Sequence, residues 1–182
     1  INGKINDSIK NYKRAIKNKP DYVDAYNNLG ISLQKLNRIT EARNTFEKAI
    51  KIKPDYFLSH NNLGNIFLSL GENVDAAKSY QKAIKLNYNC YEAHSNLGIA
   101  LNLLGKFDES ISHYEKAIKI NPNFEQAYNN LAVSQVNQGQ SDEASVLYNK
   151  AFKLNPKKTQ YAINANLILP IISNSKEDLE FH

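Results

Sequence analysis

Several features are rare or missing in this 182-residue chain, and each absence excludes a class of protein. The single cysteine, Cys90, excludes an internal disulfide framework and fits a reducing compartment, so we expect a cytoplasmic protein. No run approaches the roughly 18 apolar residues of a membrane-spanning helix, so we expect no membrane partner. The N-terminal sequence INGKINDSIKNYKR lacks the basic and then apolar layout of a secretory signal.

Glycine and proline are also few, at seven and five, which argues against a loop-rich or disordered chain. The chain has no methionine, even at residue 1, and we therefore expect it to be a piece of a longer protein. Its net charge of +5 is mild, and its apolar content of 42% is ordinary. This length suits either one packed domain or a run of small units.

What the chain does contain is an internal repeat with a period of 34 residues. Proline holds one position in four copies, with Tyr88 in its place in a fifth: Pro20, Pro54, Pro122 and Pro156. Alanine holds another position in every copy, and an aromatic residue always precedes it by three: Ala15, Ala49, Ala83, Ala117 and Ala151. A Leu–Gly pair begins at Leu29, Leu63 and Leu97, and it becomes Leu–Ala at Leu131. Repetition of this depth indicates a chain built from similar units.

Each unit reads as two helices separated by a turn. In the first helix, one face carries an aromatic residue or histidine, the Leu–Gly pair and a further apolar residue, as in Tyr26, Leu29 and Leu33. The turn is marked by Gly3, Gly71, Gly105 and Gly139, with Asn37 in one copy. The second helix ends on lysine and has an acid in its first turn, which both suit the helix dipole. These acids are Asp7, Glu41, Asp75, Glu109 and Glu143.

The period and its aromatic, Leu–Gly, alanine and proline positions resemble the tetratricopeptide repeat (TPR) family. The resemblance covers about residues 1–169 and implies an all-α fold, a right-handed superhelix of antiparallel helix pairs. We expect residues 1–22 to be the second half of a truncated repeat, with a helix over residues 4–18. Full repeats are expected at 23–56, 57–90, 91–124 and 125–158, followed by a capping helix at 159–169 and a tail at 170–182. Departures from the family pattern at Ser8, Tyr88, Ser110 and Gln135 predict locally looser packing.

Asparagine occupies one first-helix position in every unit, and the last helix continues the register: Asn28, Asn62, Asn96, Asn130 and Asn164. We call these five residues the asparagine ladder. The resemblance implies that first helices line a concave groove, so we expect the ladder to face that groove. A carboxamide both donates and accepts hydrogen bonds, so the ladder predicts pairing with the backbone of an extended peptide. The alternative is an asparagine-rich composition with hydrogen bonds between repeats.

The residues just before the ladder are expected at the groove edge, where they would widen the polar strip: Asn27, Asn61, Ser95 and Asn129. Farther along the same face lie Ile31, Asn65, Ile99 and Val133, and then Gln34, Leu68, Asn102 and Val136. Asn27, Asn61, Asn65 and Asn129 complete the predicted peptide-binding set. Chaperone-binding TPR domains hold a C-terminal carboxylate with Lys and Arg, but the matching positions here include Asn27, Ile31, Glu92 and Asn96. We therefore expect no carboxylate clamp.

Other chemistry is poorly represented. Ten cations form a stripe along the second helices: Arg14, Lys17, Lys48, Lys51, Lys82, Lys85, Lys116, Lys119, Lys150 and Lys153. Acidic residues share these helices and no aromatics interleave, so we interpret the stripe as a solvated face and expect no nucleic-acid partner. His60 and His94 take the aromatic packing position. Cys90 and His94 have i, i+4 spacing, but no further metal ligand is evident. Without a phosphate loop, nucleophile elbow or paired carboxylates, we expect no catalytic residue, metal or cofactor.

The segment LILPIISNSKEDLEF, Leu167 to Phe181, resembles a linker in bacterial relatives of protein O-linked N-acetylglucosamine transferases, where it joins TPR arrays to the catalytic region. In that family an asparagine ladder holds acceptor polypeptides. The resemblance therefore implies a substrate-recruiting arm of a larger glycosyltransferase. Two function classes remain open: a non-catalytic scaffold that binds an extended polypeptide, and a structural or assembly protein that self-associates through exposed array ends.

Overall fold

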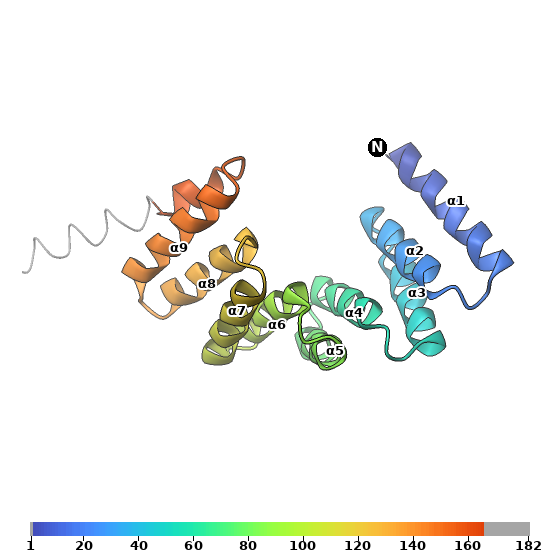
Figure 1. Ribbon diagram of the computed structural model, residues 1–182, viewed down its shortest axis with the longest axis horizontal. Helices are drawn as coiled ribbons and strands as arrows, with labels where there is room; N and C mark the ends of the chain where they lie inside the picture. The colour runs from blue at the N-terminus through green and yellow to red at the C-terminus, as the bar shows by residue number, and fades with distance from the viewer. Residues whose placement is uncertain (1, 166–182) are drawn as a thin grey trace, which may run out of the picture. The chain divides into compact units, whose positions relative to one another are not determined.

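The structure, a computed structural model, describes residues 2–165, and these residues are helical apart from short turns. The helices are α1 (Asn2–Asn18), α2 (Val23–Lys35), α3 (Ile39–Ile52), α4 (Phe57–Ser69), α5 (Asn73–Leu86), α6 (Tyr91–Leu103), α7 (Phe107–Ile120), α8 (Glu125–Asn137) and α9 (Ser141–Leu154) (Figure 1). A further helical stretch begins at residue 160. The described part of the chain contains no strand. The predicted all-helical array of antiparallel helix pairs is confirmed for these residues.

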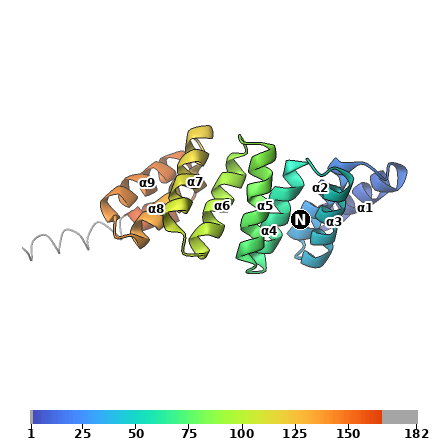
Figure 2. The ribbon, with the colours of Figure 1, turned by 90° about the horizontal axis from the view of Figure 1, so that it is seen from below.

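The chain forms two compact units, Ile1–Asn89 and Cys90–His182. In the first unit each helix from α1 to α5 packs on the next, and α2 also contacts α4. In the second unit α6 to α9 pack in the same succession, and α6 also contacts α8 (Figure 2). Each unit therefore brings together the first helices of two successive repeats.

An aromatic ring from the second helix fills the space beside the glycine of each Leu–Gly pair. A Cβ atom added at Gly30 would lie 2.5 Å from Phe46 Cε1, and one added at Gly98 would lie 2.6 Å from Tyr114 Cε1. Real Cβ atoms do not approach other carbons so closely, so glycine permits this helix spacing. In the last repeat Ala132 replaces the glycine, and it remains fully buried in a cluster with Tyr148.

The turn glycines serve a different purpose. Asn37, Gly71, Gly105 and Gly139 all have positive φ, between 57° and 78°. This left-handed conformation suits glycine and is tolerated by asparagine, which explains the exchange at Asn37. The expectation for Gly3 is wrong, because Gly3 lies inside α1. Among the described residues no helix precedes it that a turn would have to reverse.

Helix ends follow the predicted charge pattern with one exception. The first turns of α3, α5, α7 and α9 contain the expected acids, and their last turns contain the expected lysines. Asp7 is not in the first turn of α1, because that helix begins at Asn2 rather than near residue 4. None of the helices within residues 2–165 combines the length and apolar character needed to cross a bilayer.

The expectation of looser packing at the departures from the repeat pattern is wrong for Ser110 and stays a prediction at the other positions. Ser110 is fully buried, and its Oγ donates to the Gly98 carbonyl at 2.8 Å, so this site is tightly packed and satisfied. Gln135 differs from Ser110, because its buried Oε1 has no hydrogen-bond partner among the described residues. Tyr88, which replaces the proline, is exposed and lies just before the division between the units.

Candidate functional site

The paired asparagines of α2 have opposite environments. Successive side chains point about 100° apart around a helix, so neighbours face different surroundings. Asn27 is only 4% exposed, whereas Asn28 is exposed to solvent. Asn27 Oδ1 accepts hydrogen bonds from Asn62 Nδ2 at 2.9 Å and from Ser59 Oγ at 3.3 Å, both on α4. The first asparagine of this pair thus joins two repeats, and the second faces outward.

Burial corrects the expectation for the groove edge. Asn61 and Ser95 are buried, as Asn27 is, so these three side chains do not form an accessible polar strip. These three side chains lie on the side of the first helix that packs against other helices. Asn129 is half-buried, and its Nδ2 donates to Asn130 Oδ1 at 3.2 Å. In α2 the first residue of the pair therefore bonds to the next repeat, and in α8 the first residue orients the carboxamide of the second.

The ladder residues remain more accessible than the residues before them. Asn62, Asn96, Asn130 and Asn164 are half-buried, and Asn28 is exposed. Asn62 donates one N–H to Asn27, while Asn130 and Asn164 each accept one internal hydrogen bond. A carboxamide has two N–H donors and an oxygen with two lone pairs. One internal bond therefore orients each of these side chains without using up its capacity for a ligand. Asn65 is also held, because its Oδ1 accepts from Tyr80 Oη at 2.7 Å.

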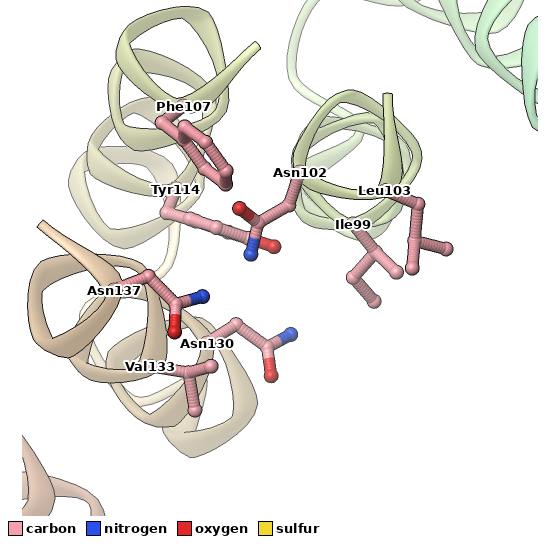
Figure 3. A pocket seen from close by; sticks show the side chains of 8 residues that line it. All are labelled: Ile99, Asn102, Leu103, Phe107, Tyr114, Asn130, Val133 and Asn137. Carbon is pink, nitrogen blue, oxygen red and sulfur yellow. The ribbon is translucent and has the colours of Figure 1, made fainter. Parts of the chain in front are cut away.

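A cavity of about 390 Å³, here called the α6–α8 hollow, opens in the second unit (Figure 3). Eight residues line it, and none carries a charge: Ile99, Asn102, Leu103, Phe107, Tyr114, Asn130, Val133 and Asn137. Sequence reasoning placed Ile99, Asn102, Asn130 and Val133 along the groove. It missed Leu103 and Asn137, one residue past the last expected position of each first helix. It also missed Phe107 and Tyr114, because only first helices were expected to line the groove and α7 is a second helix.

Hydrogen bonds fix the orientation of Asn102 in this hollow. Ser134 Oγ donates to the Asn130 carbonyl at 3.1 Å, so its own lone pairs accept from Asn102 Nδ2 at 3.2 Å. The Asn102 oxygen therefore points away from Ser134. This oxygen is buried and has no hydrogen-bond partner in the described part of the chain. Tyr114 forms part of the same wall, and burial raises its pKa to about 12.

Three buried or half-buried titratable groups outside the hollow, Cys90, His94 and His113, lack the properties of reactive groups. Cys90 is buried, and burial raises the pKa of its thiol to about 11, so the thiolate is scarce near neutral pH. His94 is also buried, as its packing position predicted, and its Nδ1 lies 3.0 Å from Nδ1 of His113. Burial, Lys116 and His94 together lower the pKa of His113 to about 4. His113 is therefore neutral at physiological pH.

The basic stripe is solvated. Nine of its ten cations are exposed, and Lys116 is half-buried. None of them lines the α6–α8 hollow.

Comparison with known families accounts for most of the chain. The model described as "TPR repeat" matches residues 1–37, 32–71 and 64–105. Two models described as "Tetratricopeptide repeat" match residues 91–124 and 113–144. The chain belongs to the tetratricopeptide repeat family. The matching models describe TPR repeats, and they give no support for a link to glycosyltransferases. That link is predicted from the asparagine ladder together with the Leu167–Phe181 segment, and this segment lies outside the described residues.

Solved TPR structures resemble this TPR chain over most of its length. A crystal structure of MamA is 28% identical, covers 87% of this chain and 93% of its own, and has a TM-score of 0.73. TTC0263, a thermophilic TPR protein from Thermus thermophilus, is 21% identical with a TM-score of 0.77, covering 92% of this chain and 91% of its own. YrrB, described as a TPR protein with an unusual peptide-binding site, is 20% identical with a TM-score of 0.73. The match covers 93% of this chain and 87% of the YrrB chain. No curated protein sequence matches the chain.

TPR proteins bind other proteins or peptides, and a protein–protein interaction role follows from the family. Residues 2–165 form TPR helices and no catalytic domain. The candidate sites of this TPR protein are therefore binding surfaces within each unit: the accessible ladder residues of each unit and, in the second unit, the α6–α8 hollow.

Proposed function

We propose that this chain is a non-catalytic TPR scaffold that binds an extended, uncharged polypeptide through the carboxamides of its asparagine ladder. One observation carries the proposal. In the α2 pair, Asn28 is exposed to solvent while its neighbour Asn27 is buried and hydrogen-bonded to α4. If asparagine at this point of the repeat served only to join repeats, Asn27 would suffice, and the exposed Asn28 would have no role.

Preorganisation supports the same conclusion. Asn62 and Asn130 each have one internal hydrogen bond, which limits the side-chain freedom that a ligand would otherwise have to restrict. Extended backbone presents alternating N–H and C=O groups, and a carboxamide matches both. The hollow lined by Asn130 contains no charge that would favour a carboxylate or ammonium group.

The TPR protein YrrB has been described with a peptide-binding site, so a fold of this kind can hold a peptide. A substrate-recruiting arm of a glycosyltransferase is one setting in which such binding would be useful. That setting stays a prediction from Leu167–Phe181, and determining the gene sequence beyond His182 would test it.

The proposal is tested with a capped, fluorescein-labelled peptide of serine, glycine and leucine, measured by fluorescence anisotropy. Asn28→Ala and Asn130→Ala should each weaken binding about two- to twelvefold, the equivalent of one neutral hydrogen bond of about 0.5–1.5 kcal/mol. Asn44→Ala and Asn149→Ala are the matched controls. They remove exposed asparagines from the second helices α3 and α9 and should leave the affinity unchanged.

Equal effects of the ladder and control substitutions would contradict the proposal. Binding that is absent in the wild-type chain, together with concentration-dependent self-association in sedimentation, would instead favour the assembly role.

A further inference from the structure

We infer that the α6–α8 hollow is an anchor pocket, which takes one large aliphatic side chain of leucine size from the bound polypeptide. The inference rests on the proposed function and deepens it, because it specifies one residue class in a ligand otherwise held by its backbone. Asn102 is the residue that orients the anchor.

The size of the hollow limits what it can hold. A volume of about 390 Å³ lies near the lower end of the roughly 300–1,000 Å³ of small-ligand pockets. It suits a single large side chain with its adjoining backbone, and it is too small for a packed helix. Apolar side chains on α6 and α8, Ile99, Leu103 and Val133, provide the wall that an aliphatic group would cover.

Charge excludes other occupants. A buried ammonium or carboxylate needs an opposite charge or several hydrogen bonds, and no lining residue is ionised near neutral pH. The polar groups at the hollow are carboxamides and the Tyr114 hydroxyl. An uncharged aliphatic residue flanked by peptide groups matches this combination of apolar walls and neutral hydrogen-bonding groups.

The oxygen of Asn102 provides the polar contact. A buried acceptor without a partner has lost its hydration and gained no hydrogen bond in exchange, so a donor that reaches it is favoured. Figure 3 shows the Asn102 carboxamide between the Phe107 ring and the carboxamides of Asn130 and Asn137. Phe107 is 38% exposed at the start of α7, so its ring has room to turn aside. The backbone N–H of the anchor residue then donates to Asn102 Oδ1.

Two side-chain hydrogen bonds connect the helices around this point. Gln138 Nε2, just after α8, donates to Asp108 Oδ1 in the first turn of α7 at 3.0 Å. Asn102 joins α6 to Ser134 of α8 through its Nδ2. These bonds connect the three helices that line the hollow, so ligand binding needs a turn of the Phe107 ring rather than a shift of the helices.

The test uses N-acetyl-leucine-N-methylamide as the probe, because it presents one aliphatic side chain and its flanking peptide groups. In ¹H–¹⁵N spectra of the whole chain, the probe should shift the side-chain amide signals of Asn102, Asn130 and Asn137 in a saturable manner. The corresponding capped alanine and capped lysine should produce much weaker shifts. Absence of these shifts up to the solubility of the capped leucine overturns the inference.

Two substitutions with one matched control locate the site. Val133→Lys places a charge in the hollow and should abolish the shifts. Val146→Lys makes the same change on α9, at a valine that is 69% exposed and does not line the hollow, and should preserve them. Asn102→Ala should weaken probe binding about two- to twelvefold, and circular dichroism checks that it remains helical. Unchanged binding in Val133→Lys overturns the inference.

The capped-leucine experiment and the peptide-binding test of the ladder can fail separately. Capped leucine that binds the hollow while no extended peptide binds would refute the proposed function and leave the pocket in place. Peptide binding that depends on Asn28 and Asn130 but is indifferent to leucine and to Val133→Lys would refute the pocket alone.

Discussion

At the residue scale, the glycines of the Leu–Gly pairs and the glycines of the turns have different physical roles. Gly98 lies within α6 at normal helical φ, and the nearby Tyr114 ring occupies the space that a Cβ would need. Gly105 has φ of 75° and no atom within 4 Å of an added Cβ. One glycine is required by packing and the other by backbone conformation.

Alanine substitutions should separate these roles. Gly98→Ala should lower the free energy of unfolding by about 1–2 kcal/mol, since overpacking outweighs the gain of roughly 1 kcal/mol in helix propensity. Gly105→Ala should lower it by about 1–2 kcal/mol through left-handed strain. When both substitutions are repeated in a chain that carries Tyr114→Leu, the loss from Gly98→Ala should become smaller and the loss from Gly105→Ala should stay the same. Urea unfolding measures both, and a more stable Gly98→Ala chain would show that α6 and α7 do not need this close approach.

At the scale of helices, polar bonds between first helices add to the apolar core. Asn27 on α2 accepts from Ser59 and Asn62 on α4, and the Tyr56 hydroxyl donates to Asp24 Oδ1 at 2.6 Å. Ser59 is fully buried, so its hydroxyl depends on the Asn27 carboxamide. This cluster fixes the register of α2 against α4.

Removing the centre of this cluster should destabilise the first unit. Asn27→Ala leaves the buried Ser59 hydroxyl without its acceptor and should lower the free energy of unfolding by about 1–3 kcal/mol. Asn28→Ala, one residue away, should change it by no more than about 0.5 kcal/mol, since the side chain is exposed. Thermal or urea unfolding of the two single variants gives the comparison. Equal losses would mean that both asparagines serve the fold.

The helix pairs were predictable from the sequence because their signals are local and repeated. Apolar spacing, the Leu–Gly pairs and the turn glycines each specify a helix or its end within one 34-residue unit. The different roles of Asn27 and Asn28 were not predictable, since they depend on how α2 is rotated against α4. Part of the lining of the α6–α8 hollow was predictable, because Ile99 and Val133 follow from the register of the first helices. Phe107 was not, because it comes from a neighbouring helix whose rotation the sequence does not specify.

At the scale of the whole molecule, each compact unit carries accessible ladder residues of its own. Asn28 lies in the first unit and Asn130 in the second, each at the same position of its repeat. The division falls beside Tyr88, the one departure from the proline register. Effects of substitutions in the two units should therefore be measured singly before they are combined.

The central claim is that ladder carboxamides pair with the backbone of the ligand, and a change in the ligand tests this most directly. The capped serine–glycine–leucine peptide is compared with a copy in which N-methyl groups replace the backbone N–H donors. Each peptide is titrated against the wild-type chain and against Asn28→Ala in a double-mutant cycle, which cancels the effect of methylation on the free peptide. The account predicts that N-methylation weakens binding to the wild-type chain about tenfold, and that Asn28→Ala reduces this penalty by about two- to tenfold. The same methylation penalty in both proteins would contradict it.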